Sequence, residues 1–282
     1  MQAVALHPTH GIPGEALHLR ALGCNFVIHC QASPEICRAL DIAFGGMWAP
    51  FTPGRATLEY RVQQTASAIL LETDATSIRA EDIGELVYLL DKSITLALQR
   101  VRADLCFLHS GAVVAPDGRV IVLTAASGSG KSTLTWALLH HGFGYLSDEL
   151  APIDPATLLV HSYPHALCLK RQPPEPYHLP SATLDTSYSL HVPVAATAQQ
   201  GSLAAIFFVG HRHPENHPIL SEVSPARSAL HLYANTLNPL SHPNDGLDAI
   251  AKIVQQVPSY ALNSTNLGAA CTAIQALLAR TP

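Results

Sequence analysis

A long apolar stripe runs through residues 80–103. Its members recur at spacings of three and four, the period of one helix face, so we predict a helix here whose stripe packs into a core. The stripe consists of Ile83, Leu86, Val87, Leu90, Ile94, Leu98 and Val101. Upstream, the short apolar runs at 26–29, 57–62 and 67–72 are separated by turns with Pro or Gly and predict strands. Residues 1–103 therefore predict a small α+β region.

The pattern changes after residue 104. Two apolar runs, CFLHSGAVV and RVIVLT, are joined by Pro116-Asp117-Gly118, which predicts a hairpin. A predicted helix over 131–141 ends at Gly142, a residue typical of helix C-termini. Later elements are a strand over 202–209, helices that start near Pro225 and Pro243, a strand near 259–264 and a helix over 267–280. We therefore predict a second, α/β domain over 104–282, with an irregular segment at 172–200.

Composition narrows the function classes. The 282 residues are 48% hydrophobic with a formal charge of −5, so a globular protein is predicted and a basic nucleic-acid surface is not. No apolar run reaches the roughly 18 residues of a membrane-spanning helix, and the N-terminus lacks the pattern of a secretory signal. The six cysteines form no C-x-x-C pair, which disfavours a zinc or redox motif. A cytoplasmic protein with free thiols is the expectation.

A glycine-rich turn lies between the predicted strand that ends at Thr124 and the predicted helix that begins at Lys131. It carries the second half of the phosphate-loop pattern G-x-x-x-x-G-K-[ST], with Ala125 in place of the first glycine. Glycines let backbone N–H groups converge on phosphate oxygens, while Lys131 can neutralise phosphates and Ser132 can ligate Mg²⁺. A nucleotide-phosphate site is therefore predicted at Ser127, Gly128, Ser129, Gly130, Lys131, Ser132 and Thr133.

Two adjacent acids, Asp148 and Glu149, follow a strand-like run soon after this helix. A neighbouring strand would bring them beside the phosphates, where one can hold the metal and the other can take a proton from an attacking hydroxyl. His109 lies on the run before the loop strand. The histidines at 211, 213 and 217 favour a solvated turn over a metal site, because no regular element fixes their spacing. Arg212 is a weak candidate for stabilising transferred charge.

These motifs together resemble the HPr kinase/phosphorylase superfamily, and in particular its smaller HPr-kinase-like serine kinases. The resemblance rests on the histidine run LHSGAV (108–113), the loop SGSGKS (127–132) and the acid-bearing run LSDE (146–149). It covers residues 105–154 well and residues 105–280 loosely. It implies a P-loop kinase core with a mixed sheet and flanking helices.

The resemblance also implies roles for single residues. Asp148 would be the general base that activates an acceptor serine, and His109 would lie close to the reacting groups. Lys131 and Ser132 would bind ATP and Mg²⁺, with Glu149 assisting the metal. Lys170 resembles a lysine of the small relatives that could contact phosphate or substrate.

Long family members carry a glycine-rich signature loop with a metal-binding glutamate, associated with dephosphorylation. The corresponding stretch here, SYPHALCLKRQPP, has no such loop, so kinase activity without phosphorylase activity is expected. Small relatives phosphorylate a peptide serine in lasso-peptide and similar systems, so a peptide or small protein is the expected partner. Two alternatives stay open: a small-molecule kinase and a nucleotide-dependent switch. The role of residues 1–103 also stays open, since they could recognise the peptide or support the core. A homo-oligomeric state is a further open alternative.

Overall fold

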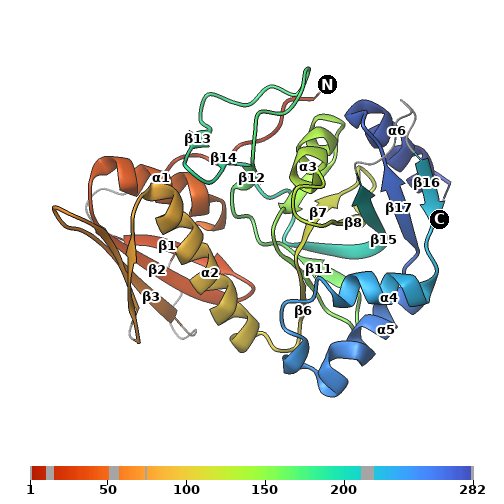
Figure 1. The fold of residues 1–282 in the computed structure, drawn as a ribbon, viewed down its shortest axis with the longest axis horizontal. Helices are drawn as coiled ribbons and strands as arrows, with labels where there is room; N and C mark the ends of the chain where they lie inside the picture. The colour runs from red at the N-terminus through yellow and green to blue at the C-terminus, as the bar shows by residue number, and fades with distance from the viewer. Residues whose placement is uncertain (1, 11–15, 51–56, 74, 211–218, 281–282) are drawn as a thin grey trace.

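The computed structural model describes residues 2–10, 16–50, 57–73, 75–210 and 219–280, which form a mixed α/β fold with three sheets. Figure 1 shows two layered parts side by side, one built from the N-terminal hundred residues and one from the remainder. The boundary predicted near residue 103 falls between helix α2 (Ile83–Val101) and strand β6 (Cys106–Leu108).

The first part contains a five-stranded sheet in the order β1-β2-β3-β4-β5. Strands β2 and β3 are parallel because helix α1 (Pro34–Phe44) crosses between them, and the other neighbouring pairs are antiparallel. The strands predicted at 26–29, 57–62 and 67–72 correspond to β2, β3 and β4. The bounds are β1 Ala16–Ala21, β2 Cys24–Gln31, β3 Thr57–Gln64, β4 Ile69–Glu72 and β5 Ser77–Ala80.

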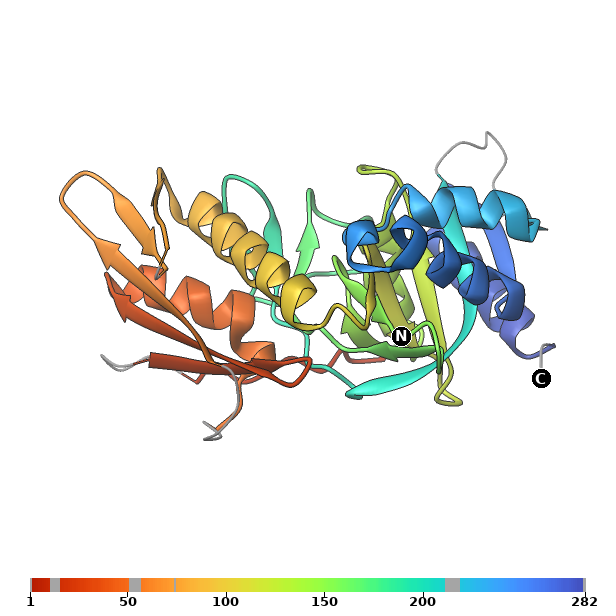
Figure 2. The same ribbon diagram turned by 90° about the horizontal axis from the view of Figure 1, so that it is seen from below.

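Helix α2 packs its apolar stripe against this sheet, as predicted, and Figure 2 shows the helix lying across the strands. Leu86, Leu90, Ile94 and Leu98 are fully buried, whereas Val101 at the helix end is exposed. The side chain of Asp82 accepts a hydrogen bond from the Glu85 N–H at 2.8 Å and so caps the helix N-terminus. One face of α2 therefore belongs to the core, which leaves its other faces available to solvent or ligands.

The second part contains a nine-stranded mixed sheet in the order β6-β10-β11-β15-β8-β7-β9, with β17 beside β15 and β16 beside β17. Strand β15 is parallel to β8 and β17, and the other pairs are antiparallel. The predicted hairpin is present as β7 and β8. The further bounds are β7 Ser110–Val114, β8 Val120–Thr124, β9 Gly144–Ser147, β10 Ala151–Ile153, β11 Leu159–His161, β15 Gln200–Gly210, β16 Ile219–Glu222 and β17 Ser259–Asn263.

Helices cover both faces of this sheet. Helices α3 (Lys131–His140) and α6 (Leu267–Leu278) share one apolar core with it, and α4 (Pro225–Tyr233) and α5 (Leu247–Gln256) share another. Figure 1 shows these two pairs above and below the sheet. The helix expected to start at Pro243 instead begins with a 3₁₀ turn, Pro243–Gly246, in which Asn244 and Asp245 have positive φ. Regular α5 follows that turn.

Two long strands are interrupted side by side. The chain runs from β6 into β7 through His109, and from β9 into β10 through residues 148–150. Leu108 pairs with Ala151 before the interruption, and Ala112 pairs with Ser147 after it. Three residues on each chain therefore leave this ladder at the same place. The interruption gives His109, Asp148 and Glu149 side-chain directions that a continuous ladder would not allow.

A small third sheet, β12-β14-β13, lies between the two parts (Figure 1). Its strands are β12 (Leu167–Leu169), β13 (Leu184–Asp185) and β14 (Leu190–Val192), so the segment expected to be irregular at 172–200 contains two short strands. The segment is also held to α3, because Trp136 Nε1 donates to the Tyr177 carbonyl at 3.2 Å. Strands this short depend on their partners, since β14 pairs with β12 and β13 pairs with β14, and their own sequence does not reveal this pairing.

The expectation of free thiols holds for only part of the chain. Cys30, at the end of β2, and Cys37, in α1, are joined by a disulfide, whereas Cys24, Cys106, Cys168 and Cys271 are free. The disulfide was missed because the packing of α1 onto β2 brings the two residues together, not a cysteine motif. In the ranges described, no helix combines the length and apolar character needed to cross a membrane.

Candidate functional site

The glycine-rich turn joins β8 to α3 and has the conformation that its glycines permit. Gly128 and Gly130 have φ values of 83° and 89°, in the left-handed region that side chains with a Cβ rarely adopt. Ala125 is not among the residues with positive φ, so its methyl group is accommodated in place of the usual glycine. The turn therefore presents backbone N–H groups and a helix N-terminus at one place.

Lys131 is the first residue of α3, and its side chain is only 8% exposed. Its Nζ contacts the backbone carbonyl of Asp148 and lies 3.5 Å from Oδ1 of Asp148 and 3.9 Å from Oε1 of Glu149. Burial alone would lower the pKa of Lys131, but the two carboxylates offset it and the pKa is raised. A charged ammonium therefore lies between the turn and the acids.

The two acids have different surroundings. Asp148 is 1% exposed, and its Oδ2 accepts a bond from the Cys168 N–H at 3.4 Å. Glu149 is 34% exposed and points into a cavity. Burial, partly opposed by Lys131 and reinforced by Asp148, raises the pKa of Glu149 to about 7. Of the two acids, Glu149 is the one that meets solvent, and Asp148 lies behind Lys131.

His109 stands beside Glu149, with its Nδ1 3.4 Å from Oε2 of that residue. The backbone N–H of His109 donates to the Asn235 carbonyl at 2.8 Å, which fixes the interruption between β6 and β7. Burial and the charge of Lys131 lower the pKa of His109, so the ring is neutral near pH 7. The structure thus brings His109, Lys131 and the adjacent pair Asp148 and Glu149 together from three separate points in the sequence.

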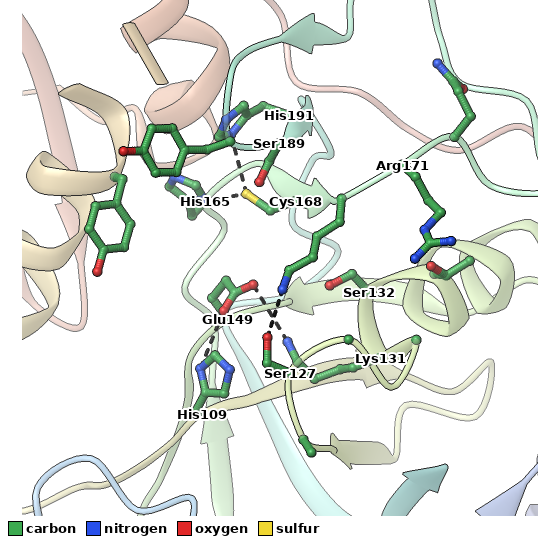
Figure 3. A pocket seen from close by; sticks show the side chains of 18 of the residues that line it. His109, Ser127, Lys131, Ser132, Glu149, His165, Cys168, Arg171, Ser189 and His191 are labelled. Carbon is green, nitrogen blue, oxygen red and sulfur yellow. Dashed lines mark hydrogen bonds and ion pairs between the residues drawn. The ribbon is translucent and has the colours of Figure 1, made fainter. Parts of the chain in front are cut away.

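These residues open into a cavity of about 610 Å³, a size typical of small-ligand sites. Figure 3 shows its lining, with Glu149, His109, Lys131 and Ser127 on one side and His165, Cys168 and His191 on another. Asp148 and Ser129 do not line it. The residues expected from the sequence that do line it are His109, Ser127, Gly128, Gly130, Lys131, Ser132, Thr133, Glu149 and Lys170.

Lys170 follows β12 and reaches across the cavity to the turn. Its Nζ donates to Oγ of Ser127 at 2.8 Å. The adjacent Arg171 also lines the cavity, so two cations outside the turn join Lys131 there. Arg212 and the histidines at 211, 213 and 217 lie outside the described residues.

Sequence reasoning missed one entire wall of the cavity. Helix α2 supplies part of it, the chain before β12 supplies His165, and β12 and β14 supply Cys168 and His191. No motif marks these positions, and α2 was recognised only by its buried stripe. The sequence contained only a general indication of this wall, because irregular segments rich in Pro and Ser, such as 172–200, often line ligand sites. The members of this wall are Gly84, Val87, Tyr88, Asp91, His165, Cys168, Tyr188, Ser189 and His191.

Cys168 and His191 form a neutral contact, with Sγ 3.4 Å from Nδ1. Burial and the negative charges of Glu149 and Asp148 raise the pKa of the Cys168 thiol well above its usual value. Burial and the neighbouring His165 lower the pKa of His191 to about 3. An uncharged thiol and an uncharged imidazole follow, which does not favour a cysteine nucleophile at this position.

The donor set near the turn suits Mg²⁺. The Ser132 hydroxyl and the Glu149 carboxylate are oxygen donors that line the same cavity. Within the described ranges, no group of three or more His, Cys, Asp or Glu residues is arranged to hold a metal ion. Mg²⁺ commonly takes one or two protein oxygens and completes its shell with phosphates and water, so Ser132 and Glu149 are a sufficient protein contribution.

Comparison with known proteins gives little further support. No family model matches the sequence, and no curated protein matches it. Among solved structures, the chain aligns with the HPr(Ser) kinase/phosphatase from Coxiella burnetii at a TM-score of 0.33 and 14% identity, over 61% of this chain and 93% of that chain. A TM-score of this size does not establish a shared fold. The proposals below therefore rest on the geometry of the site.

Proposed function

We propose that this protein is an ATP- and Mg²⁺-dependent kinase that transfers the γ-phosphate to a serine hydroxyl of a peptide or small protein, without phosphorylase activity. One arrangement carries the proposal: the Lys131 ammonium ends a phosphate-binding turn and lies 3.5 Å from Asp148 and 3.9 Å from Glu149. The glycine-rich turn and Glu149 border one cavity, and Asp148 lies directly behind Lys131. Phosphoryl transfer to an alcohol needs these two elements together.

The proposed reaction is a single displacement. The acceptor oxygen forms a bond to the γ-phosphorus, the bond to the oxygen bridging to the β-phosphate breaks, and ADP leaves. The hydroxyl proton passes to a carboxylate. Most of the catalysis in such a reaction comes from positioning and from neutralising the phosphate oxygens. Lys131, Lys170 and Arg171 are the cavity cations available for the second task.

Asp148 is our candidate for the proton acceptor, and Lys131 controls its exposure. Without nucleotide, Lys131 covers Asp148 and contacts its backbone carbonyl. A phosphate-loop lysine is drawn to the β- and γ-phosphates when nucleotide binds. That movement would uncover the Asp148 carboxylate next to the transferred group. Catalytic geometry is often incomplete before substrates bind, so burial of Asp148 here is compatible with the role.

Glu149 and Ser132 would then hold Mg²⁺, which neutralises phosphate charge when bound. Because Glu149 also contacts His109, that histidine would orient the glutamate and border the acceptor hydroxyl. These assignments separate the two acids by function. Asp148→Asn should lower the transfer rate by about 100-fold, while Glu149→Gln should mainly raise the Mg²⁺ concentration required.

The test is transfer from γ-³²P-labelled ATP to a set of serine peptides and to a cell extract. Wild-type protein should label a peptide or protein acceptor, and Lys131→Ala and Asp148→Asn should not. Full transfer by Asp148→Asn together with loss in Glu149→Gln would exchange the roles of the two acids. ATP binding by calorimetry with no labelled acceptor would favour a nucleotide-dependent switch, and label found only in small metabolites would favour a small-molecule kinase.

A further inference from the structure

The cavity has two walls of opposite character. The wall formed by the phosphate turn and the end of β12 carries Lys131, Lys170 and Arg171. The facing wall, formed by α2 and the third sheet, carries Asp91 but no lysine or arginine among the cavity-lining residues described. Figure 3 shows Arg171 and His165 at opposite sides of the view. The first wall suits the phosphates, so the second is the one available to the acceptor.

Asp91 is the charged group of the second wall. It projects from α2 with 21% of its side chain exposed, and its Oδ1 accepts a hydrogen bond from the Tyr163 hydroxyl at 2.7 Å. The only basic side chain within ion-pair distance, among the residues that the structure describes, is His165, whose Nε2 lies 3.9 Å away. That distance is too long for a hydrogen bond.

The ring of His165 faces Asp91 and provides a second hydrogen-bond acceptor, its Nε2 atom. Its Nδ1 lies 2.9 Å from the Ala166 carbonyl, which can only accept, so Nδ1 carries the proton. In the neutral ring Nε2 is then an acceptor, and it has no hydrogen-bond partner in the described part of the chain. The half-buried carboxylate of Asp91, which accepts one bond from Tyr163, therefore faces the buried Nε2 of His165 with no donor from the described residues between them. A ligand with several N–H groups would satisfy both.

Aromatic rings border the same wall. Tyr88 and Tyr188 are parallel, with ring centroids 6.0 Å apart, and each is 52% exposed. The Nζ of Lys92 lies 5.9 Å from the centre of the Tyr88 ring, which shows that a cation is accepted over this ring. Burial and the nearby carboxylates of Glu85 and Asp82 raise the pKa of the Tyr188 phenol. The rim of the wall thus carries two aromatic rings, the carboxylates of Glu85 and Asp82, and the ammonium of Lys92.

The Tyr188 side of this wall is held in place before any ligand binds. Ser187 Oγ donates to Oδ2 of Asp82 at 2.7 Å, which ties the turn between β13 and β14 to the start of α2. Gly84 permits this turn to lie close to α2, because a Cβ at Gly84 would lie 2.7 Å from Ser187 Oγ and 2.9 Å from Cδ2 of Tyr188. A preformed wall lowers the ordering cost of binding.

From these observations we propose that Asp91, His165, Tyr88 and Tyr188 form a subsite for a cationic side chain, arginine or lysine, that flanks the acceptor serine. This inference rests on the proposed function for the identity of the reacting hydroxyl. It assigns the α2 region to acceptor recognition. Arginine fits best, because its planar N–H array can reach Asp91 and Nε2 of His165 while its face lies on a tyrosine.

The experiment uses full-length protein and fluorescein-labelled serine peptides of equal length. One series places a single arginine at each position within three residues of the serine, and two others carry alanine or glutamate there. Binding is measured by fluorescence anisotropy, and phosphorylation by transfer from labelled ATP. An arginine peptide should bind about tenfold more tightly than its alanine counterpart, and the glutamate peptide more weakly than either.

Variants test the named residues. Asp91→Asn should reduce the preference for arginine over alanine to about twofold or less, as a raised KM for the arginine peptide. Tyr188→Ala should reduce the preference for arginine by about threefold and leaves the hydrogen bond between Tyr163 and Asp91 intact. This variant therefore remains informative if Asp91→Asn folds poorly. Glu81→Gln, just before α2, and Leu96→Ala, on α2, are the matched controls, since both residues are exposed and neither lines the cavity. They should keep the full preference.

The two readouts separate this inference from the proposed function. Selective binding of arginine peptides without phosphate transfer would contradict the proposed function and support the subsite. Phosphorylation with no preference between arginine, alanine and glutamate would overturn the subsite and support the kinase. A preference that survives unchanged in both Asp91→Asn and Tyr188→Ala would also overturn the subsite.

Discussion

The Nζ of Lys170 donates to Oγ of Ser127 across 2.8 Å, and this single contact joins the end of β12 to the phosphate turn. The two residues are far apart in sequence, and they follow strands of different sheets, β12 and β8. The contact holds a cation beside the turn before any nucleotide is present. It also offers a direct way to test whether the turn is a nucleotide site.

Replacement of Lys170 by alanine should weaken ATP-Mg²⁺ binding about fivefold, because a cation beside the phosphates and an anchor of the turn are both lost. Calorimetric titration with ATP measures the effect. Lys252→Ala, a lysine on α5 that does not line this cavity, serves as the control and should bind ATP normally. Unchanged affinity in Lys170→Ala would remove this residue from the nucleotide site.

Replacement of Lys131 by methionine should destabilise the fold as well as prevent ATP binding. The change leaves the buried Asp148 carboxylate without its cation, which costs about 3 kcal/mol in the free energy of unfolding. The double variant Lys131→Met, Asp148→Asn should regain about half of that loss, because the uncompensated charge is gone. Urea unfolding of the three proteins checks this, and equal stability of the single and double variants would contradict it.

Replacement of Gly128 by alanine isolates the backbone requirement of the turn. A Cβ at Gly128 would have open space around it, so only the φ of 83° opposes the change. We expect a loss of about 1 kcal/mol in stability and a larger loss in ATP affinity, as the turn relaxes away from its left-handed conformation. Gly118→Ala, at φ 89° in the distant β7–β8 hairpin, should lose stability similarly and keep ATP affinity.

The stability of the protein should fall as the pH is lowered from about 6.5 toward 3, partly because of His191. Its folded-state pKa of about 3 lies below the ordinary value near 6.5, so the unfolded chain takes up a proton that the folded chain refuses. At pH 5 the proton uptake lowers the free energy of unfolding by about 2 kcal/mol, and above pH 7 this loss vanishes. Urea unfolding at pH 7.5 and 5 should show a smaller difference for His191→Asn than for wild type.

A matched control for that experiment is His178→Asn. His178 is an exposed residue paired with Glu175 at 3.0 Å, and its removal should leave the pH dependence close to that of wild type. If His191→Asn lost as much stability on acidification as the wild-type protein, the buried neutral imidazole would not be the source of the effect.

Features whose residues are contiguous in the sequence could be predicted, whereas features formed by the packing of distant segments could not. The glycine-rich turn over 127–133 was predicted between a strand and a helix, and β8 and α3 are there, because its residues lie in one short run; that it binds phosphate stays a prediction. Helix α2 was predicted because its buried face repeats with the helical period. The exposed positions Tyr88 and Asp91 carry no such signal, since nothing in a single sequence shows what faces them.

Two further examples show the same limit. Helix α1 was not predicted, although Ser33 followed by Pro34 is a typical helix start, and in the structure Ser33 accepts a hydrogen bond from the Ile36 N–H at 3.5 Å. Its pairing with β2 through Cys30 and Cys37 is not visible, because it depends on how the crossover packs. Likewise Asp148 was expected near Lys131, but its burial behind that lysine is a property of three-dimensional packing.

The matched interruption of the two long strands has a consequence for how this protein can change over time. Side chains alternate between the two faces of a strand, so adding or deleting one residue in either chain would change the register of the flanking pairs and displace the interruption that contains His109 and Asp148. An insertion in one strand is tolerated only with a compensating change in the other. Sequences descended from a common ancestor should therefore vary in loop length around this sheet and keep the distance from His109 to the hairpin, and from Asp148 to β10, constant.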